Sequence, residues 1–267
     1  MKNEKLKLAI LGYGKMGKTI ENIALQRGHT IVAKIDNEDD WKQFENNVGA
    51  NPCGHPIADV AIEFSTPQTA VKNIFRCFDL NIPIVVGTTG WNEQKEDIIS
   101  YCNQHQKALF YASNLSIGVN LFFELNKKLA QMMKNYSDYH VHIEETHHLQ
   151  KLDKPSGTAI SLAENLISNY PSKTSWTCDA MACKGEASAG ADLQSVPKTS
   201  ETLNIKTFRE EEVFGIHNVL YESNEDIIEI KHEAKSRQGF AKGAVFAAEW
   251  LVGKIGIYTM TDLLKLK

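Results

Sequence analysis

Short apolar runs alternate with helix-type segments along the first 114 residues. The runs have the length and composition of buried β-strands, and the segments between them space apolar residues for one helical face. The expected strands lie at residues 6–11, 29–36, 60–65, 82–91 and 108–114, with helices at about 18–27, 67–80 and up to 105. Consecutive strand and helix units with nearly continuous apolar strands predict an α/β fold with a doubly wound parallel sheet.

The alternation stops after Asn114, which indicates a second, differently built domain. A long apolar helix is expected at 118–135, followed by a strand (YHVHIEE) and a helix at 157–169. Residues 203–234 then contain three β-type runs separated by short polar turns, as expected of an antiparallel or mixed sheet. Residues 172–202 lack periodicity, so we expect an extended surface loop there.

A helical pattern returns over residues 238–267 and predicts that the chain rejoins its first domain. The second domain is then an insertion between two chain crossings. We expect domain limits of 1–116 plus 238–267 for the first domain and 117–237 for the inserted α+β domain. Both crossings contain glycine, which suits a hinge.

The motif GYGKMG at residues 12–17 lies between the first strand and the first helix. Gly12 permits a tight turn, Gly14 lets backbone amides approach a pyrophosphate, and Gly17 lets the helix pack closely on the strand. Asp36 follows nineteen residues after Gly17, at the end of the second strand, where a carboxylate can hold an adenosine ribose. Strand, glycine turn, helix and acid together predict a Rossmann-type dinucleotide site.

Composition narrows the classes of protein. Of 267 residues 42% are hydrophobic and 23% charged, which is typical of a folded chain, and the net charge of −4 offers no general attraction to nucleic acid or anionic membranes. The five cysteines form no C-x-x-C pair, so reduced thiols and a cytoplasmic location are expected. No apolar stretch has the length of a signal-peptide core or a membrane span.

Residues 144–159 (EETHHLQKLDKPSGTA) concentrate groups suited to acid–base chemistry. His147 and His148 are adjacent, Lys151 follows, and Ser156 to Thr158 provide hydroxyl and amide donors at the start of a helix. Imidazoles exchange protons near neutral pH, and an ammonium group with donors at a helix N-terminus binds carboxylates. This stretch predicts an active-site loop for a small anionic substrate. The alternative is two surface histidines and a turn.

The order of His147, His148, Lys151, Asp153, Pro155, Ser156, Gly157 and Thr158 resembles the signature of the dihydrodipicolinate reductase family. Two further segments, GTTGW and FYASNLSIGVNL, resemble family segments that line the cofactor. The resemblance implies NAD(P)H-dependent reduction of 4-hydroxy-tetrahydrodipicolinate, with loss of water, in diaminopimelate and lysine biosynthesis. It also implies a homotetramer built through the sheets of the inserted domains, to which residues 203–234 could contribute.

Site roles are carried over by the same resemblance. His147 corresponds to the acid/base histidine, Lys151 to a proton-donating or substrate-polarising lysine, and His148 to a substrate-binding neighbour. Further substrate contacts are expected from Ser156, Gly157, Thr158 and Thr89. Expected cofactor contacts are Gly12, Tyr13, Gly14, Lys15, Met16, Gly17, Asp36, Ser65, Thr66, Gly87, Thr88, Thr89, Ala112, Ser113, Asn114 and Leu115.

Two departures from the family pattern bear on cofactor choice. Lys15 stands where the common family form has arginine, and the segment from Asn37 to Asp59 is short for the family. Asp36 would repel a 2′-phosphate, whereas Lys15 or Lys34 could tolerate one. We expect use of both NADH and NADPH, with NADH preferred.

Other interpretations remain open at this point. Another NAD(P)-dependent dehydrogenase of the amino-acid type would share the first domain without needing the histidine loop. A nucleotide-sensing regulator would need a DNA- or partner-binding module, and no basic helix-turn-helix is visible. Four histidines at 140, 142, 147 and 148 suggest zinc, but adjacent strand residues point apart and no thiolate pair accompanies them, so no metal is expected. Asp153 is as consistent with a turn as with assistance to Lys151. Arg237 has either an active-site or a solvent-exposed role, and His217 and His232 are assigned structural hydrogen bonds.

Overall fold

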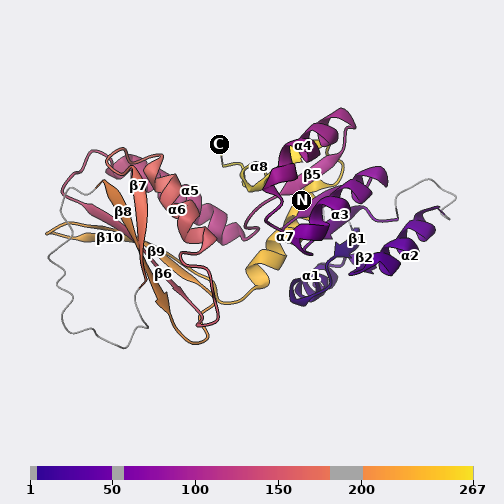
Figure 1. Ribbon diagram of the computed structural model, residues 1–267, viewed down its shortest axis with the longest axis horizontal. Coiled ribbons are helices and arrows are strands. Elements are labelled where there is room, and N and C mark those ends of the chain that lie inside the picture. The colour runs from indigo at the N-terminus through magenta and orange to yellow at the C-terminus, as the bar shows by residue number, and fades with distance from the viewer. Residues whose placement is uncertain (1–4, 50–56, 181–200, 267) are drawn as a thin grey trace. The chain divides into compact units, whose positions relative to one another are not determined.

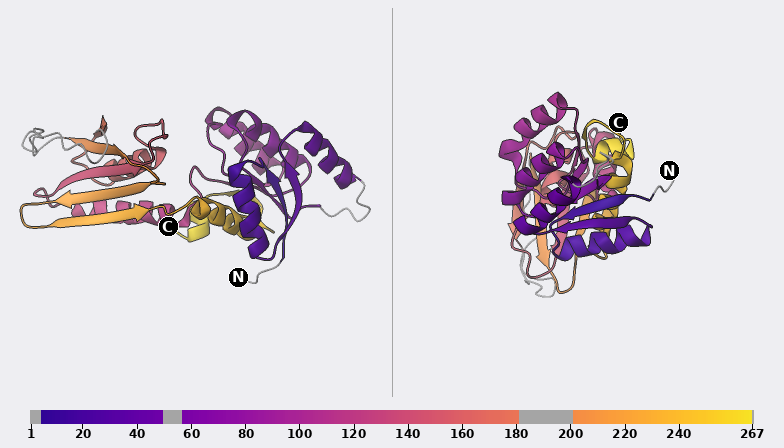
Figure 2. Two further views of the ribbon diagram at one scale, coloured as in Figure 1. Left: turned by 90° about the horizontal axis from the view of Figure 1, so that it is seen from below. Right: turned by 90° about the vertical axis from the view of Figure 1, so that its right-hand side faces the viewer.

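The computed structural model describes residues 5–49, 57–180 and 201–266. The chain divides into two compact units (Figures 1 and 2). Unit 1 comprises Met1–Asn120 and Arg237–Lys267, and unit 2 comprises Leu121–Ser236. Each unit has its own sheet and its own core.

Unit 1 is built on a six-stranded sheet in the order β11-β5-β4-β3-β1-β2, and every neighbouring pair is parallel. The strands are β1 (Lys7–Leu11), β2 (Thr30–Ile35), β3 (Val60–Glu63), β4 (Ile84–Val86), β5 (Ala108–Tyr111) and β11 (Gly256–Tyr258). The helices are α1 (Lys15–Gln26), α2 (Glu38–Gly49), α3 (Pro67–Asp79), α4 (Lys95–Gln104), α7 (Gln238–Leu251) and α8 (Met260–Leu264), with a short 3-10 helix, η1 (Asn92–Gln94).

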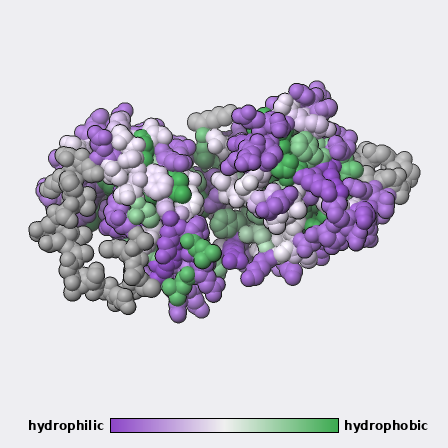
Figure 3. Space-filling view, viewed as in Figure 1, coloured by the Kyte–Doolittle hydropathy of each residue, from purple (hydrophilic) through white to green (hydrophobic). Residues whose placement is uncertain are grey.

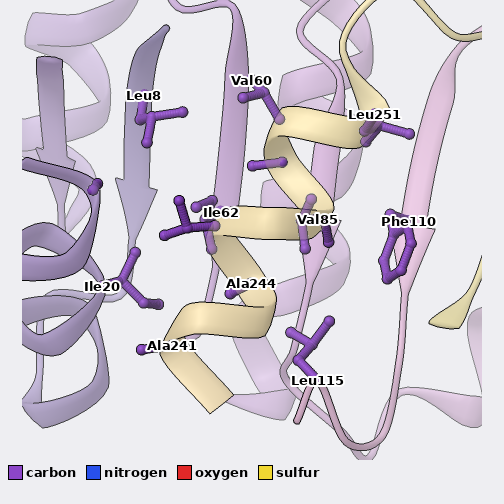
Figure 4. Packing of buried hydrophobic residues seen from close by; sticks show 14 of the residues in the cluster. Leu8, Ile20, Val60, Ile62, Val85, Phe110, Leu115, Ala241, Ala244 and Leu251 are labelled. Atoms are coloured by element: carbon purple, nitrogen blue, oxygen red, sulfur yellow. The ribbon is translucent and has the colours of Figure 1, made fainter. Parts of the chain in front are cut away.

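Alternate residues of β1 enter two different cores, as the two-residue period of a strand requires. Leu8 and Ile10 pack with residues of α1 and α7, whereas Ala9 and Leu11 pack with residues of α2, α3 and α4. Figure 4 shows the first core, where Ala244 of α7 lies close to Ile62. Both faces of the sheet are therefore covered, which explains why its strands read as continuous apolar runs.

Glu249 of α7 binds the turn between α1 and β2. The Arg27 guanidinium donates to its carboxylate from Nε (2.6 Å) and Nη2 (2.8 Å), and His29 Nε2 lies 2.7 Å away. Burial alone would raise the pKa of Glu249, but the Arg27 and His29 contacts outweigh it and lower that pKa. The carboxylate is therefore held in its charged form beside its partners.

Two elements of unit 1 correct the sequence-based expectations. Residues 238–267 are not one continuous helical pattern, because α7 ends at Leu251 and the chain adds β11 beside β5 before α8. Gly253 and Gly256, with φ of +76° and +113°, make this change of direction. The segment after Asn37, described above only as short, contains α2. The Asn37 side chain caps it by accepting from the amides of Asp39 (2.9 Å) and Asp40 (3.0 Å).

Unit 2 contains a mixed five-stranded sheet in the order β10-β9-β6-β8-β7. Strand β6 is antiparallel to β9 and parallel to β8. The strands are β6 (His140–His147), β7 (Ser175–Ala180), β8 (Thr202–Arg209), β9 (Ile216–Glu222) and β10 (Ile227–Glu233). Helices α5 (Ile117–Met133) and α6 (Gly157–Ile167) supply apolar residues such as Phe122 and Leu162 to a core with Ile143 and Val219.

The expectation of a loop throughout residues 172–202 is wrong at its start. Strand β7 occupies Ser175–Ala180 and pairs in parallel with β8 from Ser175 opposite Thr202. Its sequence, SWTCDA, is short and forms a largely exposed edge strand, so no alternation of apolar residues marks it. Residues 181–200 of the expected loop lie outside the described residues.

Candidate functional site

The glycine turn of unit 1 connects β1 to the N-terminus of α1. Gly12 has φ of +88°, and a Cβ there would lie 2.2 Å from the carbonyl oxygen of Phe64, so only glycine fits. A Cβ on Gly17 would lie 2.3 Å from the carbonyl oxygen of Gly12. Gly14 and Lys15 are exposed where α1 begins. The first amides of a helix can bind phosphate, so this turn has the form of a dinucleotide site.

Asp36 lies beside this turn, because its carboxylate accepts from the backbone amide of Tyr13 (2.9 Å). The neighbouring Lys34 pairs with a carboxylate of the protein itself. Its Nζ lies 2.6 Å from Glu21 Oε1 and 4.8 Å from the centre of the Tyr13 ring, and the Tyr13 hydroxyl donates to the same Glu21 carboxylate. Of the two lysines considered for a 2′-phosphate, Lys34 already has a carboxylate partner.

The remaining expected cofactor contacts follow strands β3, β4 and β5 at one edge of the parallel sheet. Ser65 and Thr66 come after β3, Gly87 to Thr89 after β4, and Ala112 to Leu115 after β5. Thr66, Thr89 and Ser113 are exposed, while the Leu115 side chain is buried in the core and leaves only its backbone for contacts. Met16 also packs partly against this core.

Glu63, at the end of β3, was not predicted as part of this edge. Its side chain is fully buried, and one carboxylate oxygen accepts from the Ser65 amide (3.0 Å) and the Ser65 hydroxyl. Its backbone carbonyl accepts from the Gly87 amide (2.9 Å). Glu63 thus connects the segments after β3 and β4. Burial raises its pKa despite the hydrogen bonds from Ser65 and Asn73.

We expect Glu63→Gln to change the pH dependence of stability. Because the folded pKa lies above the usual value of 4.5, wild-type protein loses stability as pH rises from that value through the folded pKa. The glutamine variant cannot ionise, so the difference between its free energy of unfolding and that of wild type should move in favour of the variant as pH rises from about 4 to about 8. Urea unfolding across this range measures it. The exposed Glu96→Gln is the control, and a difference that does not grow with pH contradicts the assignment.

Unit 2 places the histidine loop at the end of β6, where a cluster of polar side chains is buried. The alternation of β6 ends there, since Glu145, Thr146 and His147 are all buried. His147 Nε2 lies 3.5 Å from Glu145 Oε2 and 3.3 Å from Nε2 of His217, while His147 Nδ1 lies 3.3 Å from the Phe214 carbonyl oxygen. The acid/base candidate is therefore held by protein groups at both ring nitrogens.

Glu145 is the centre of this buried cluster. Its carboxylate accepts from the Ser156 amide at both oxygens (3.1 and 3.0 Å), and Arg209 Nη1 lies 3.8 Å from Oε1. Burial alone would raise the pKa of Glu145, but the nearby imidazoles of His147 and His217 and the hydrogen bonds from Ser156 hold that pKa well below its usual range. Burial lowers the pKa of His217 in spite of Glu145. The cluster thus holds a carboxylate and a neutral His217 imidazole at neutral pH.

Arg209 fixes the loop that follows β6. Its guanidinium donates to the carbonyl oxygens of Asp153 (2.8 Å from Nη2) and Lys151 (3.4 Å from Nε). The Lys151 ammonium pairs with both carboxylate oxygens of Asp153 at 2.8 Å, so Asp153 is the partner of Lys151 in this structure. His148 lies half-buried between this loop and the strand, and its carbonyl accepts from the Lys151 amide.

The residues expected to bind substrate at the N-terminus of α6 differ in their surroundings. The Ser156 hydroxyl caps the helix by accepting from the Ala159 amide (3.2 Å) and lies 3.0 Å from His217 Nε2, so it belongs to the buried cluster. Gly157 is exposed and Thr158 is half-buried. An anion at this end of the helix would meet the backbone of Gly157 and Thr158 before the buried Ser156 hydroxyl.

Glu145, Arg209 and His217 were missed by sequence reasoning or given only a structural role. Glu145 lies two residues before His147, on the same side of a strand, which was an available signal. The other two depend on strand pairing, because Arg209 is opposite His147 on β8 and His217 is opposite Glu145 on β9. Nothing local to residue 209 or 217 indicates either neighbour.

Within the described part of the chain, possible ligand atoms of Glu145, His147 and His217 lie within 4.8 Å of one another, as a metal site would require. This is not the set of four histidines considered from the sequence. The Ser156 amide already donates to the Glu145 carboxylate, and the Arg209 guanidinium lies beside it, so hydrogen bonding and charge pairing account for the cluster. The absence of a metal stays a prediction.

None of the described helices has the length and apolar composition needed to cross a membrane. On the face of the molecule in Figure 3, hydrophilic residues surround separate, smaller hydrophobic areas.

Comparisons with known proteins cover almost the whole chain. Family models described as the N-terminus and the C-terminus of dihydrodipicolinate reductase match residues 6–115 and 118–264. A 4-hydroxy-tetrahydrodipicolinate reductase of Christiangramia forsetii is 48% identical over 262 residues, covering 97% of this chain and 98% of that protein. One from Lawsonia intracellularis is 32% identical over 269 residues, covering 97% and 99%.

Solved structures confirm the predicted fold class. A dipicolinate-bound dihydrodipicolinate reductase from Paenisporosarcina sp. TG-14 matches with a TM-score of 0.69 and 22% identity, covering 97% of this chain and 99% of that one. An amine dehydrogenase from Mycobacterium smegmatis matches less well, with a TM-score of 0.56 and 11% identity, over 96% and 95% of the two chains. At these identities the likeness concerns the fold.

Proposed function

Because the chain belongs to the dihydrodipicolinate reductase family, we propose that it reduces 4-hydroxy-tetrahydrodipicolinate with NAD(P)H, with loss of water, to tetrahydrodipicolinate. This reaction belongs to diaminopimelate and lysine biosynthesis. The observation that carries the proposal is the 48% identity to a named reductase over nearly the full length of both proteins. An amino-acid-type dehydrogenase on the same plan would account for unit 1 but not for the histidine loop.

The residues of unit 1 fit a reduced nicotinamide dinucleotide, which when bound supplies the hydride. The exposed amides at the start of α1 would hold the pyrophosphate, and Asp36 would accept from a ribose hydroxyl. The Gly87–Thr89 and Ala112–Leu115 segments would line the nicotinamide end. Unit 2 would hold the substrate, and His147 would transfer a proton as its general acid or base. Lys151, His148 and the N-terminus of α6 would bind the substrate carboxylates.

A preference for NADH over NADPH is supported by the charges beside the glycine turn. Asp36 accepts from the Tyr13 amide beside the turn, and Lys34 pairs with Glu21, so Lys15 is the remaining lysine of the two considered for a 2′-phosphate. Repulsion between Asp36 and the phosphate would favour NADH.

We expect Asp36→Ser to shift the ratio of kcat/KM for NADPH over that for NADH upward by about tenfold, the effect of a change near 1.4 kcal/mol. Removing the carboxylate relieves the repulsion and weakens the ribose contact. Steady-state rates with both cofactors measure the ratio. Asp39→Ser, which removes an equal charge from the exposed start of α2, should leave it unchanged, and a similar shift in both variants would show a general charge effect instead.

A planar dicarboxylate should compete with the substrate. The Paenisporosarcina reductase was solved with dipicolinate bound, and we propose that the same class of ligand binds beside Lys151 in this chain. Lys151 would exchange its pairing with Asp153 for one with a ligand carboxylate.

We therefore expect Lys151→Ala to weaken dipicolinate binding by about 10- to 100-fold, because a charge-assisted hydrogen bond contributes about 1.5–3 kcal/mol. Calorimetry of the protein saturated with NADH measures the affinity. Lys154→Ala, an exposed lysine of the same loop, is the matched control. Unchanged affinity in the Lys151 variant would remove that residue from the carboxylate site.

The decisive test of the function is a coupled assay in which dihydrodipicolinate synthase generates the substrate. We expect oxidation of NADH or NADPH only when the synthase and its substrates are present. Turnover of an amino acid or sugar, with none of the synthase product, would instead support the other dehydrogenase class.

Two further aspects belong to the proposal. Domain limits of 1–116 plus 238–267 and of 117–237 assign cofactor and substrate to separate parts of the chain.

A homotetramer formed through the second sheet is supported by the edge strand β10, which exposes Ile227 and Ile228. Light scattering of the purified protein tests this assembly. A cytoplasmic location stays a prediction.

A further inference from the structure

The proposed function gives His147 the proton-transfer role within its buried cluster. The cluster also contains Glu145, His217 and Arg209, all buried and all within 4 Å of at least one other member. A buried carboxylate and a second buried imidazole are costly to desolvate, so their contact with a proposed acid/base residue needs an explanation.

The hydrogen bonds restrict which ring nitrogen of His147 carries its proton. A carbonyl oxygen only accepts, so the contact between Nδ1 and the Phe214 carbonyl places a proton on Nδ1. In the neutral ring Nε2 is then an acceptor, and it faces His217 Nε2 at 3.3 Å. In the protonated ring Nε2 becomes a donor, and the Glu145 carboxylate lies 3.5 Å away to receive it.

His217 has the matching arrangement. Its Nδ1 is buried and has no hydrogen-bond partner among the described residues, whereas its Nε2 faces His147 Nε2, the Ser156 hydroxyl at 3.0 Å and Glu145 at 3.7 Å. A proton on Nδ1 would be a buried donor without an acceptor, so the proton of the neutral ring belongs on Nε2. There it can be donated to neutral His147 or to Ser156.

We propose that Glu145 and His217 are positioning residues that hold His147 in one ring orientation and one tautomer through both of its protonation states. His217 donates to Nε2 of neutral His147, and Glu145 accepts from Nε2 of protonated His147. When His147 gains its proton, the His217 N–H turns to the Ser156 hydroxyl. The backbone at Gly215 also restricts the His147 ring, because a Cβ at that position would lie 2.9 Å from His147 Cε1. The proposal rests on the acid/base role of His147 proposed above.

The test compares His217→Phe with His232→Phe. Phenylalanine keeps a ring in place but removes the Nε2 donor. His232 lies directly opposite His217 on β10, has an Nδ1 with no hydrogen-bond partner among the described residues, and stacks on Phe122, so it is a matched control. We expect His217→Phe to lower kcat by about 100-fold, the effect of misplacing a reacting group, with KM and NADH affinity nearly unchanged. His232→Phe should keep wild-type kcat.

A second readout does not depend on turnover. The ¹⁵N signals of the His147 ring in the resting protein should report one tautomer, with the proton on Nδ1, in wild type and in His232→Phe. In His217→Phe they should report a mixture of tautomers. His217→Gln, whose amide can donate to His147, should restore much of both kcat and the single tautomer.

The outcomes distinguish the positioning role of His217 from the acid/base role of His147 on which it rests. Identical His147 ring signals in wild type and His217→Phe would overturn the positioning role, whatever the activity. Full turnover in His147→Gln would remove the acid/base assignment while the ring signals still showed whether His217 holds the imidazole. Loss of stability in His217→Phe with unchanged kcat would mark His217 as merely structural, which also contradicts the proposal.

Discussion

Replacement of His147 by glutamine should lower turnover by about 10²- to 10⁴-fold, the usual contribution of a general acid or base. Glutamine has a similar reach and can keep a hydrogen bond to the Phe214 carbonyl, but it exchanges no proton near neutral pH. NADH binding should be unchanged, because the proposed cofactor contacts belong to unit 1 and His147 to unit 2. Coupled-assay rates and fluorescence titration with NADH measure the two effects separately.

His140→Gln is the matched control for this prediction. It makes the same substitution at the other end of β6, outside the buried cluster, and should retain wild-type turnover. Equal losses in the two variants would indicate a general effect on the strand. Wild-type turnover in His147→Gln would transfer the proton chemistry to another group, of which Lys151 is the candidate that the family resemblance implies.

Replacement of Arg209 by methionine should cost about 3–5 kcal/mol of stability, the usual effect of removing one partner from a buried ion pair. Methionine fills much of the arginine stem's volume but removes the guanidinium that pairs with the fully buried Glu145 carboxylate. The carbonyl oxygens of Lys151 and Asp153 also lose a donor. The free energy of unfolding in urea measures the loss, and dipicolinate affinity reports whether the Lys151 loop has moved.

Lys206→Met on the same strand is the control for Arg209. Lys206 Nζ lies 3.3 Å from Glu144 Oε1, but both side chains are about a quarter exposed, so solvent screens the pair. Its loss should cost about 1 kcal/mol or less. Similar losses of unfolding free energy in both variants would show that the burial of Glu145 does not strengthen its pair with Arg209.

The glycine turn and the histidine loop could be identified before any fold was known. Gly12 is required by a local backbone conformation, and the β-strand before it and the helix after it are visible in local apolar spacing. Residues His147 to Thr158 are close in sequence, so their grouping needs no tertiary contact. Short elements escaped this reasoning, because β7 and β11 contain six and three residues and take their conformation from the strands beside them.

Sequence alone thus determined the α/β class, the glycine turn after β1 and the grouping of His147 and Lys151 in one loop, because each depends on neighbours along the chain. Tertiary structure decided which side chains face that chemistry. It placed Arg209 and His217 beside Glu145 through the registers of β8 and β9, across more than sixty positions of sequence. It also paired Lys34 with Glu21, a contact that local sequence did not indicate. Strand register and burial set these contacts, and neither is encoded at a single position.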